Sequence, residues 1–266
     1  MNKYTIYGNP VSHSKSPQMH NAGFKLLNID AIYNTTHLED GEKIKQHLLE
    51  YNINGANITV PHKEIAFKKA DQVFGMANKI GAVNTYINKG GKVIGYNTDA
   101  PGFLKAIEEF GIIKNGLILG AGGTAKAIAI AFQEKNIKTT ILNRSKNRLK
   151  FFNNHNCDTY TWDNFPIEQQ YDLVINTTTA GLQDDNLPCP QDILNQILKN
   201  SKFAIDCIYG KTTPFLKEAQ NHNIPSKDGE DMLLFQGVLA FELFTGVKAD
   251  KALIEAMRRG LKGESK

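Results

Sequence analysis

The sequence predicts an α/β protein with largely parallel sheets. Strand-like and helix-like segments alternate over most of the 266 residues, which is typical of βαβ units. The apolar fraction of 41% and the charged fraction of 22% are those of an ordinary folded chain. The length fits either one large domain or two modest ones.

The chain begins with a strand and a helix. Apolar residues over 4–7 predict the strand, and the helix starts at Ser16-Pro17, with Ser16 as N-cap and Pro17 at the first helical position. A second strand is expected over residues 31–36 and a second helix over residues 40–51.

The next run, "ANITVPHKE" at residues 56–64, predicts a strand that Pro61 ends, because proline cannot donate to the sheet ladder. Lys63 is therefore expected at the end of a strand. Residues 84–99 predict a hairpin, since alternating runs flank Lys89-Gly90-Gly91, and residues 101–110 have helical spacing of their apolar side chains.

A second unit is expected from about Gly116. It reads as a buried strand, a glycine turn and an alanine-rich helix, and residues 139–152 read as another strand and helix. Residues 171–181 and 202–210 are expected to supply two more strand ends. The last two helices, near 232–246 and 251–263, have no strand between them, so they are expected to leave the second unit and pack on the first.

Composition excludes several classes of function. Lys and Arg exceed Asp and Glu by only 31 to 27 and form no long run, so no nucleic-acid partner is expected. No apolar stretch approaches the roughly 18 to 20 residues of a membrane span. The first residues show no apolar h-region or small-residue cleavage site, so export is not expected. Three distant cysteines and histidines without HxxxH or HExxH spacing predict a cytoplasmic protein with reduced thiols and no metal site.

The glycine turn predicts a dinucleotide site. Gly120, Gly122 and Ala125 satisfy GxGxxG/A directly after the strand Leu117–Leu119 and directly before a helix. The first glycine permits the tight turn, the second lets the backbone approach a pyrophosphate, and the small third residue lets the helix pack on the strand. Amides at the start of the helix would then face the phosphates.

The end of the next strand favours NADP(H) over NAD. An acidic residue would be expected there for NAD, but Asn143-Arg144-Ser145 occupies the position and Arg148 follows. A guanidinium can bind a 2′-phosphate with two hydrogen bonds. The alternative is that both arginines only form a solvated start of a helix.

Polar residues that do not help build a core follow several of the predicted strands. In α/β folds the carboxyl ends of strands form the ligand crevice, so these residues can converge on one small polar, possibly anionic substrate. They are Ser12, Ser14, Asn57, Thr59, Lys63, Asn84, Asn97, Thr98 and Asp99. Taken singly, each could instead be an ordinary cap or turn residue.

At this point the sequence resembles the shikimate dehydrogenase family. "NPVSHSKSPQMHN", "GANITVPHK", "GAVNT", "GYNTDAPGF", "LILGAGGTAKA", "NRS", "NTTTAG" and "DGEDMLLFQG" are similar to that family's successive signatures, in order, from residue 8 to about 246. The resemblance implies NADPH-dependent reduction of 3-dehydroshikimate to shikimate on the route to aromatic amino acids. It also implies an α/β substrate domain at 1–100, a Rossmann-like NADP domain at 101–230, and helices at 231–266 that complete the substrate domain.

The resemblance also implies site residues. Ser12 and Ser14 would hold the substrate carboxylate, with Tyr209 nearby, while Lys63 and Asp99 would flank the carbon that changes oxidation state. The hydroxyl-binding residues would be Thr59, Asn84 and Gln236. The cofactor-binding residues would be Gly120, Ala121, Gly122, Gly123, Thr124, Ala125, Asn143, Arg144, Ser145, Arg148, Thr177 and Gly229. The pattern departs from the family's at Thr179, Leu182 and Phe244, and the link from Tyr209 to Pro214 is one residue shorter.

Lys63 is a credible general acid for ketone reduction, because a lysine of ordinary pKa stays protonated at neutral pH and can donate a proton. Asp99 would orient it and share the proton. Two rivals stay open: a quinate/shikimate dehydrogenase with broader substrate and NAD use, and a non-catalytic ligand-binding regulator. The only partner expected is a small-molecule substrate, in a monomer or a homodimer.

Overall fold

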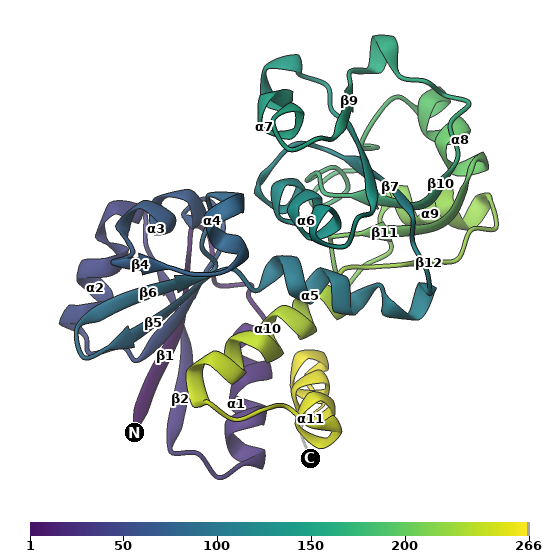
Figure 1. Ribbon diagram of the computed structural model, residues 1–266. Helices are drawn as coiled ribbons and strands as arrows, with labels where there is room; N and C mark the ends of the chain where they lie inside the picture. Colours follow the sequence, from purple (N-terminus) through teal and green to yellow (C-terminus); the bar gives the residue numbers. More distant parts are fainter. Residues whose placement is uncertain (265–266) are drawn as a thin grey trace. The chain divides into compact units, whose positions relative to one another are not determined.

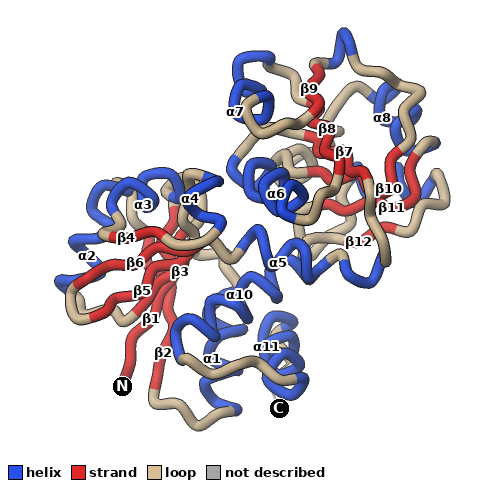
Figure 2. Tube along the Cα trace, viewed as in Figure 1, coloured by secondary structure: helices blue, strands red, loops and turns tan. Residues whose placement is uncertain are grey.

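The computed structural model describes residues 1–264, which form two compact units. Unit 1 is Met1–Gly102 together with the segment from Leu233 onward, and unit 2 is Phe103–Met232. Each unit contains one sheet flanked by helices (Figures 1 and 2), so the predicted α/β class with mainly parallel sheets is confirmed. No helix within the described part of the chain has the length and apolar character to cross a membrane.

The sheet of unit 1 has the strand order β2-β1-β3-β5-β6-β4. β1 pairs in parallel with β2 and β3, while β5 and β6 form the predicted antiparallel hairpin beside β3. β4 closes the edge parallel to β6. The strands are β1 (Asn2–Gly8), β2 (Ala31–His37), β3 (Gly55–Ile58), β4 (Gln72–Val73), β5 (Thr85–Lys89) and β6 (Lys92–Tyr96).

Both faces of this sheet are covered. Because side chains alternate along a strand, Tyr4 and Ile6 of β1 pack against α1, α10 and α11, while Tyr7 packs with α2 and α3 on the other face. The helices that carry residues of unit 1 are α1 (Ser16–Leu26), η1 (Gly41–Lys43), α2 (Ile44–Glu50), α3 (Lys63–Lys69), α4 (Met76–Ile80), the start of α5 (Asp99–Ala106), most of α10 (Glu230–Thr245) and α11 (Lys251–Lys262).

The C-terminal helix α11 lies against α1, as Figure 1 shows. Asp250 caps it by accepting a hydrogen bond from the amide of Leu253 at 2.8 Å. Gly260 permits the close packing, since a Cβ there would lie 2.6 Å from the carbonyl oxygen of Gln18. The last helices are therefore part of the core of unit 1.

The sheet of unit 2 is parallel throughout, with the order β12-β11-β10-β7-β8-β9. Numbered along the unit, this is the order 3-2-1-4-5-6 of a dinucleotide-binding Rossmann sheet read from β9 to β12. The strands are β7 (Asn115–Leu119), β8 (Lys138–Leu142), β9 (Asp158–Tyr160), β10 (Tyr171–Asn176), β11 (Ser201–Asp206) and β12 (Ser226–Lys227).

The strands of unit 2 are buried on both faces, as parallel strands usually are. Ile118 of β7 belongs to a core that α6 and α7 cover, whereas its neighbours Leu117 and Leu119 face α8 and α9. The helical segments are the end of α5, η2 (Glu108–Phe110), α6 (Gly123–Glu134), η3 (Lys146–Leu149), α7 (Lys150–Asn153), η4 (Trp162–Asn164), α8 (Gln191–Lys199), α9 (Pro214–Asn221) and the start of α10.

Two local predictions were wrong. Ser16 is not the N-cap of α1, because Lys15 occupies that position. The hydroxyl of Ser14 accepts a hydrogen bond from the backbone amide of Ser16 at 3.2 Å. Lys63 does not end a strand. β3 stops at Ile58, a turn follows, and Lys63 is the first residue of α3. Helices α3, α4, α8 and α9 were not foreseen. α3 and α4 are too short, at 7 and 5 residues, to give a clear periodic signal, whereas the apolar residues of α8 and α9 do recur at helical spacing and were missed.

The core of unit 1 contains an unusual histidine. His20 of α1 is fully buried, and neither of its ring nitrogens has a hydrogen-bond partner among residues 1–264. Its ring is stacked on that of Tyr33, with the centroids 4.4 Å apart. Burial lowers the pKa of His20 to about 3, because a charged imidazole would lie in an apolar environment.

His20 should therefore make unit 1 sensitive to acid. The unfolded chain takes up a proton at a pKa of about 6.5 that the folded chain refuses until about 3, so stability is lost as the pH falls through this window. From pH 7 to pH 4, we expect the parent to lose on the order of 3 kcal/mol more of its unfolding free energy than the His20→Leu variant loses. Urea unfolding at both pH values measures this, and equal losses would contradict it.

Candidate active site

The polar residues of unit 1 gather at one edge of its sheet because of the strand register. β3 runs parallel to β1, and Asn57 near its end pairs with Thr85, the first residue of β5. Thr85 in turn pairs with Tyr96, the last residue of β6. The ends of β3 and β6 and the start of β5 thus meet at the same edge, where Asn84 and Asp99 also lie.

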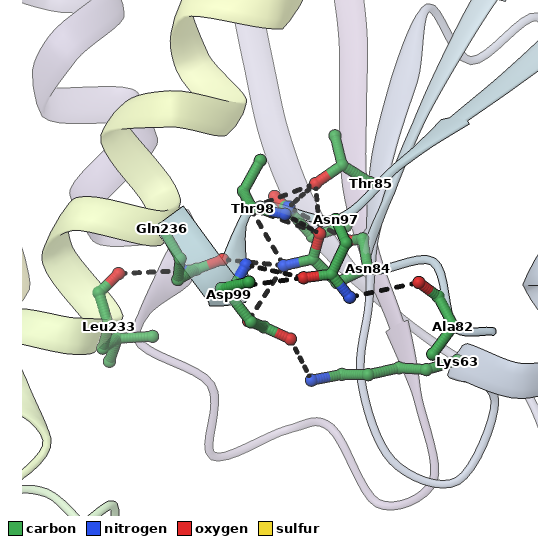
Figure 3. Close-up of polar contacts among 11 residues, drawn as sticks. Lys63, Ala82, Asn84, Thr85, Asn97, Thr98, Asp99, Leu233 and Gln236 are labelled. Carbon is green, nitrogen blue, oxygen red and sulfur yellow. Dashed lines mark hydrogen bonds and ion pairs between the residues drawn. The ribbon is translucent and has the colours of Figure 1, made fainter. Parts of the chain in front are cut away.

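Lys63 and Asp99 form an ion pair at this edge, shown in Figure 3. Lys63 Nζ lies 2.7 Å from Asp99 Oδ2, and the side chains are only 20% and 11% exposed. Each is the first residue of a helix, α3 and α5 respectively. The carbonyl of Lys63 also accepts the amide of Val83 at 3.0 Å, which ties the start of α3 to the segment before β5.

Asn84 holds the second oxygen of Asp99. Its Nδ2 donates to Asp99 Oδ1 at 2.9 Å and to Thr98 Oγ1 at 2.9 Å, while its Oδ1 accepts the backbone amide of Thr98 at 2.8 Å. Gln236 of α10 places its Oε1 3.5 Å from the same Nδ2 and anchors its own Nε2 on the carbonyl of Leu233 at 2.8 Å. The structure thus brings Lys63, Asn84, Asp99 and Gln236 together (Figure 3).

Asn97 fixes the start of the helix that carries Asp99. Its Oδ1 accepts the amides of Asp99 at 3.1 Å and Ala100 at 3.3 Å, and its Nδ2 donates to the carbonyl of Ala82 at 3.1 Å. These bonds position the backbone of Asp99 relative to the loop before β5. The sequence predicted Asn97 at the end of a strand, but it did not indicate this role in fixing the helix start.

Thr59, Ser12 and Ser14 lie on the loops that follow β3 and β1. These two loops are adjacent, because the amide of Asn9 donates to the carbonyl of Val60 at 3.1 Å. Ser12 is exposed, while Thr59 and Ser14 are half-buried. The substrate-binding roles of these three residues stay predictions.

Tyr209 belongs to unit 2, in the turn after β11. Its ring is half-buried, and burial raises the pKa of its hydroxyl. The amide of the next residue, Gly210, donates to Asp228 Oδ2 at 2.8 Å. The predicted role of Tyr209 near a substrate carboxylate stays a prediction.

In unit 2 the glycine turn directly follows β7, beside the end of the paired strand β10. Gly120 has φ +106°, a conformation that residues with a Cβ rarely adopt, and a Cβ there would lie 2.8 Å from Thr177 Oγ1. Thr177 cannot easily move, since its hydroxyl donates to the carbonyl of Leu119 at 2.7 Å. The turn therefore requires glycine at position 120.

A cavity of about 890 Å³ opens beside this turn, within the range of about 300–1,000 Å³ usual for ligand pockets. Thr178, Thr179 and Ala180, from the stretch that the sequence had singled out, contribute to its wall. Trp162 and residues 184–191 also line it and were not foreseen; for Trp162, the available signal was a single tryptophan just after a Rossmann strand. Six of the predicted cofactor residues line the cavity: Gly120, Ala121, Gly122, Arg144, Arg148 and Thr177.

The other predicted cofactor residues do not line the cavity. Gly123 and Thr124 start α6, and Ala125 is buried in the core beneath it. Asn143 Nδ2 donates to the carbonyl of Ser145 at 2.9 Å. Gly229 packs so closely on the backbone of Cys207 that a Cβ would collide with it.

No group of three or more His, Cys, Asp or Glu side chains that could hold a metal ion occurs among residues 1–264. The site of unit 1 is instead a cation–carboxylate pair embedded in amides and hydroxyls, and unit 2 is a Rossmann-type unit with a guanidinium-lined cavity. The class of protein that these features define is a nucleotide-binding α/β protein with a separate polar site that holds a lysine–aspartate ion pair.

Comparisons with known proteins identify the family. Residues 6–86 match the model of the shikimate dehydrogenase substrate binding domain, and residues 229–259 match that of the shikimate 5′-dehydrogenase C-terminal domain. The chain is 44% identical over 256 residues to a shikimate dehydrogenase (NADP(+)) of Helicobacter hepaticus, covering 96% of this chain and 95% of that protein. The chain therefore belongs to the shikimate dehydrogenase family.

Solved structures are also similar. A shikimate 5-dehydrogenase from Thermus thermophilus in complex with NADP(H) and shikimate matches with a TM-score of 0.87 at 32% identity, covering 100% of both chains. A shikimate 5-dehydrogenase from Listeria monocytogenes in complex with shikimate and NAD matches with a TM-score of 0.80 at 27% identity, covering 96% of this chain and 95% of that chain.

Replacing Gly120 or Gly122 of the turn by alanine should change the unfolding free energy by different amounts. Gly120→Ala forces a Cβ into a strained conformation against Thr177 and should lower the unfolding free energy by about 1–3 kcal/mol. Gly122→Ala is the matched control, because its φ is −87° and a Cβ would meet no atom within 4 Å. Denaturant unfolding of both variants tests the turn, and equal stability of the two would contradict this account.

Proposed function

We propose that this protein catalyses the reversible, NADPH-dependent reduction of 3-dehydroshikimate to shikimate on the route to aromatic amino acids. The observation that carries the proposal is the ion pair between Lys63 and Asp99, with Nζ and Oδ2 2.7 Å apart, in a unit that matches the family's substrate-binding domain. The relatives named as NADP(+)-dependent shikimate dehydrogenases support the reaction.

The cavity of unit 2 fits the phosphates of NADP(H). The backbone of Gly120–Gly122 can approach a pyrophosphate at the start of α6, and the guanidinium of Arg144 can bind the 2′-phosphate, with Arg148 beside it. When bound, the nicotinamide supplies or accepts the hydride. Residues 101–230 are proposed as the cofactor domain, and residues 1–100 with 231–266 as the substrate domain.

Lys63 and Asp99 are proposed to handle the proton. Protonated Lys63 donates to the oxygen of the ketone as it becomes an alcohol, and accepts the proton back in the oxidation direction. The carboxylate of Asp99 stabilises the charged ammonium and orients it, while Asn84 keeps the carboxylate in place.

The surrounding polar groups are proposed to bind the substrate. Thr59, Asn84 and Gln236 would hold its hydroxyls, and the hydroxyls of Ser12 and Ser14 would donate to its carboxylate, with Tyr209 nearby. Two neutral hydroxyls can bind a carboxylate because each donates a hydrogen bond to a charged oxygen. The protein is proposed to act in the cytoplasm as a monomer or homodimer.

One observation favours the NAD use of a second candidate, a quinate/shikimate dehydrogenase with a broader substrate range. The similar Listeria monocytogenes protein was solved with shikimate and NAD. In the present chain, Arg144 and Arg148 line the cavity where an NAD enzyme would have a carboxylate, which favours NADP(H). A non-catalytic regulator is disfavoured, because it would have no need of the ion pair at the sheet edge.

Replacing Lys63 tests the acid–base role. We expect Lys63→Ala to lower kcat for shikimate oxidation by about 10²- to 10⁴-fold with little change in KM, because a general acid–base acts mainly in the transition state. Steady-state kinetics with NADP⁺ measure both constants.

Lys45→Ala is the matched control, since Lys45 also pairs with an aspartate in unit 1, Asp71, away from the cluster of Asn84 and Asp99. It should keep the parent's kcat and KM. A Lys63→Ala variant that retained most of its kcat while its KM rose would leave Lys63 only a binding role.

A further inference from the structure

A chain of hydrogen bonds connects a buried tyrosine to the ion pair. The hydroxyl of Tyr33 on β2 donates to Asn57 Oδ1 at 2.7 Å, and Asn57 Nδ2 donates to Thr85 Oγ1 at 3.1 Å. Thr85 Oγ1 donates to Asn84 Oδ1 at 2.9 Å, and Asn84 Nδ2 donates to Asp99 Oδ1 at 2.9 Å. Every link runs in the same direction, from Tyr33 toward Asp99.

Backbone groups fix this direction at both amides. Asn57 Nδ2 also donates to the carbonyl of Asn84 at 3.3 Å, so Asn57 must turn its oxygen toward Tyr33. Asn84 Oδ1 accepts the amide of Thr98 at 2.8 Å, so Asn84 must turn its nitrogen toward Asp99. The chain has one arrangement of its protons that satisfies every group.

The chain is shielded from water. Tyr33 and Thr85 are fully buried, and Asn57 and Asn84 are 4% and 2% exposed. The stacked ring of His20 holds Tyr33 in place. Burial also raises the pKa of Tyr33 well above its ordinary value, so its hydroxyl keeps its proton and remains a donor.

We propose that Tyr33 is a positioning residue for the reaction, whose hydroxyl fixes the two amides that present Asp99 to Lys63. Without this hydroxyl, Asn57 Oδ1 has no donor in a buried site, and reversing the amide would point its oxygen at the carbonyl of Asn84. Thr85 would then donate to Asn57, and Asn84 would lose a bond that orients it toward Asp99. The role in catalysis rests on the proposed function; the coupling to Asn84 does not.

The test is Tyr33→Phe, which removes only the hydroxyl. Its kcat/KM for shikimate should fall about tenfold, mainly through kcat, as for the loss of one hydrogen bond. The acid limb of the pH–rate profile should move to higher pH, because a carboxylate with a weaker donor takes up a proton more readily. In ¹⁵N NMR the side-chain amide protons of Asn84 should exchange faster with solvent.

Tyr7→Phe is the control, since Tyr7 is equally buried in unit 1 but its hydroxyl bonds to His47 Nδ1 at 2.9 Å on α2. It should keep the parent's pH profile and the slow exchange at Asn84. A parent-like pH profile and kcat in Tyr33→Phe would overturn the proposal, and so would unchanged exchange at Asn84. An inactive parent would refute the proposed function, while the exchange measurement would still decide the coupling.

Discussion

The side-chain amide of Asn84 is the contact on which the site of unit 1 depends. Its nitrogen holds Asp99 Oδ1 and its oxygen accepts the amide of Thr98, so one side chain joins the start of β5 to the start of α5. Asn84 is 2% exposed, and each buried partner left without its hydrogen bond would cost about 1–3 kcal/mol. The cost of breaking these bonds keeps the carboxylate in one orientation, with its other oxygen free for Lys63.

The strand register provides the constraint behind this contact. Asn57, Thr85 and Tyr96 stand opposite one another on three adjacent strands, which places three loops at one edge of the sheet. A slip of one residue would turn each of these side chains to the other face. In unit 2 the corresponding constraint is steric, because Thr177 leaves no room for a Cβ at position 120.

Short-range patterns made much of this predictable from the sequence. The glycine turn at Gly120 and the hairpin around Gly90 depend on neighbouring residues, so both lie where the sequence indicated. Lys63 was given the wrong element because Pro61 marks only the end of pairing and not the helix that follows the turn. The link from Tyr33 to Asp99 could not be predicted, because it needs the order of strands in the sheet.

We propose that the Lys63–Asp99 site and the arginine-lined cavity serve a shikimate dehydrogenase that uses NADP(H). The most direct measurement is the absorbance of reduced nicotinamide when the purified protein receives shikimate and NADP⁺, beside matched reactions with NAD⁺ and with quinate. We expect fast turnover with shikimate and NADP⁺ only. Equal turnover with NAD⁺ would contradict the role assigned to Arg144, and equal turnover with quinate would contradict specificity for shikimate. Binding of shikimate without turnover would contradict the catalytic role of the ion pair.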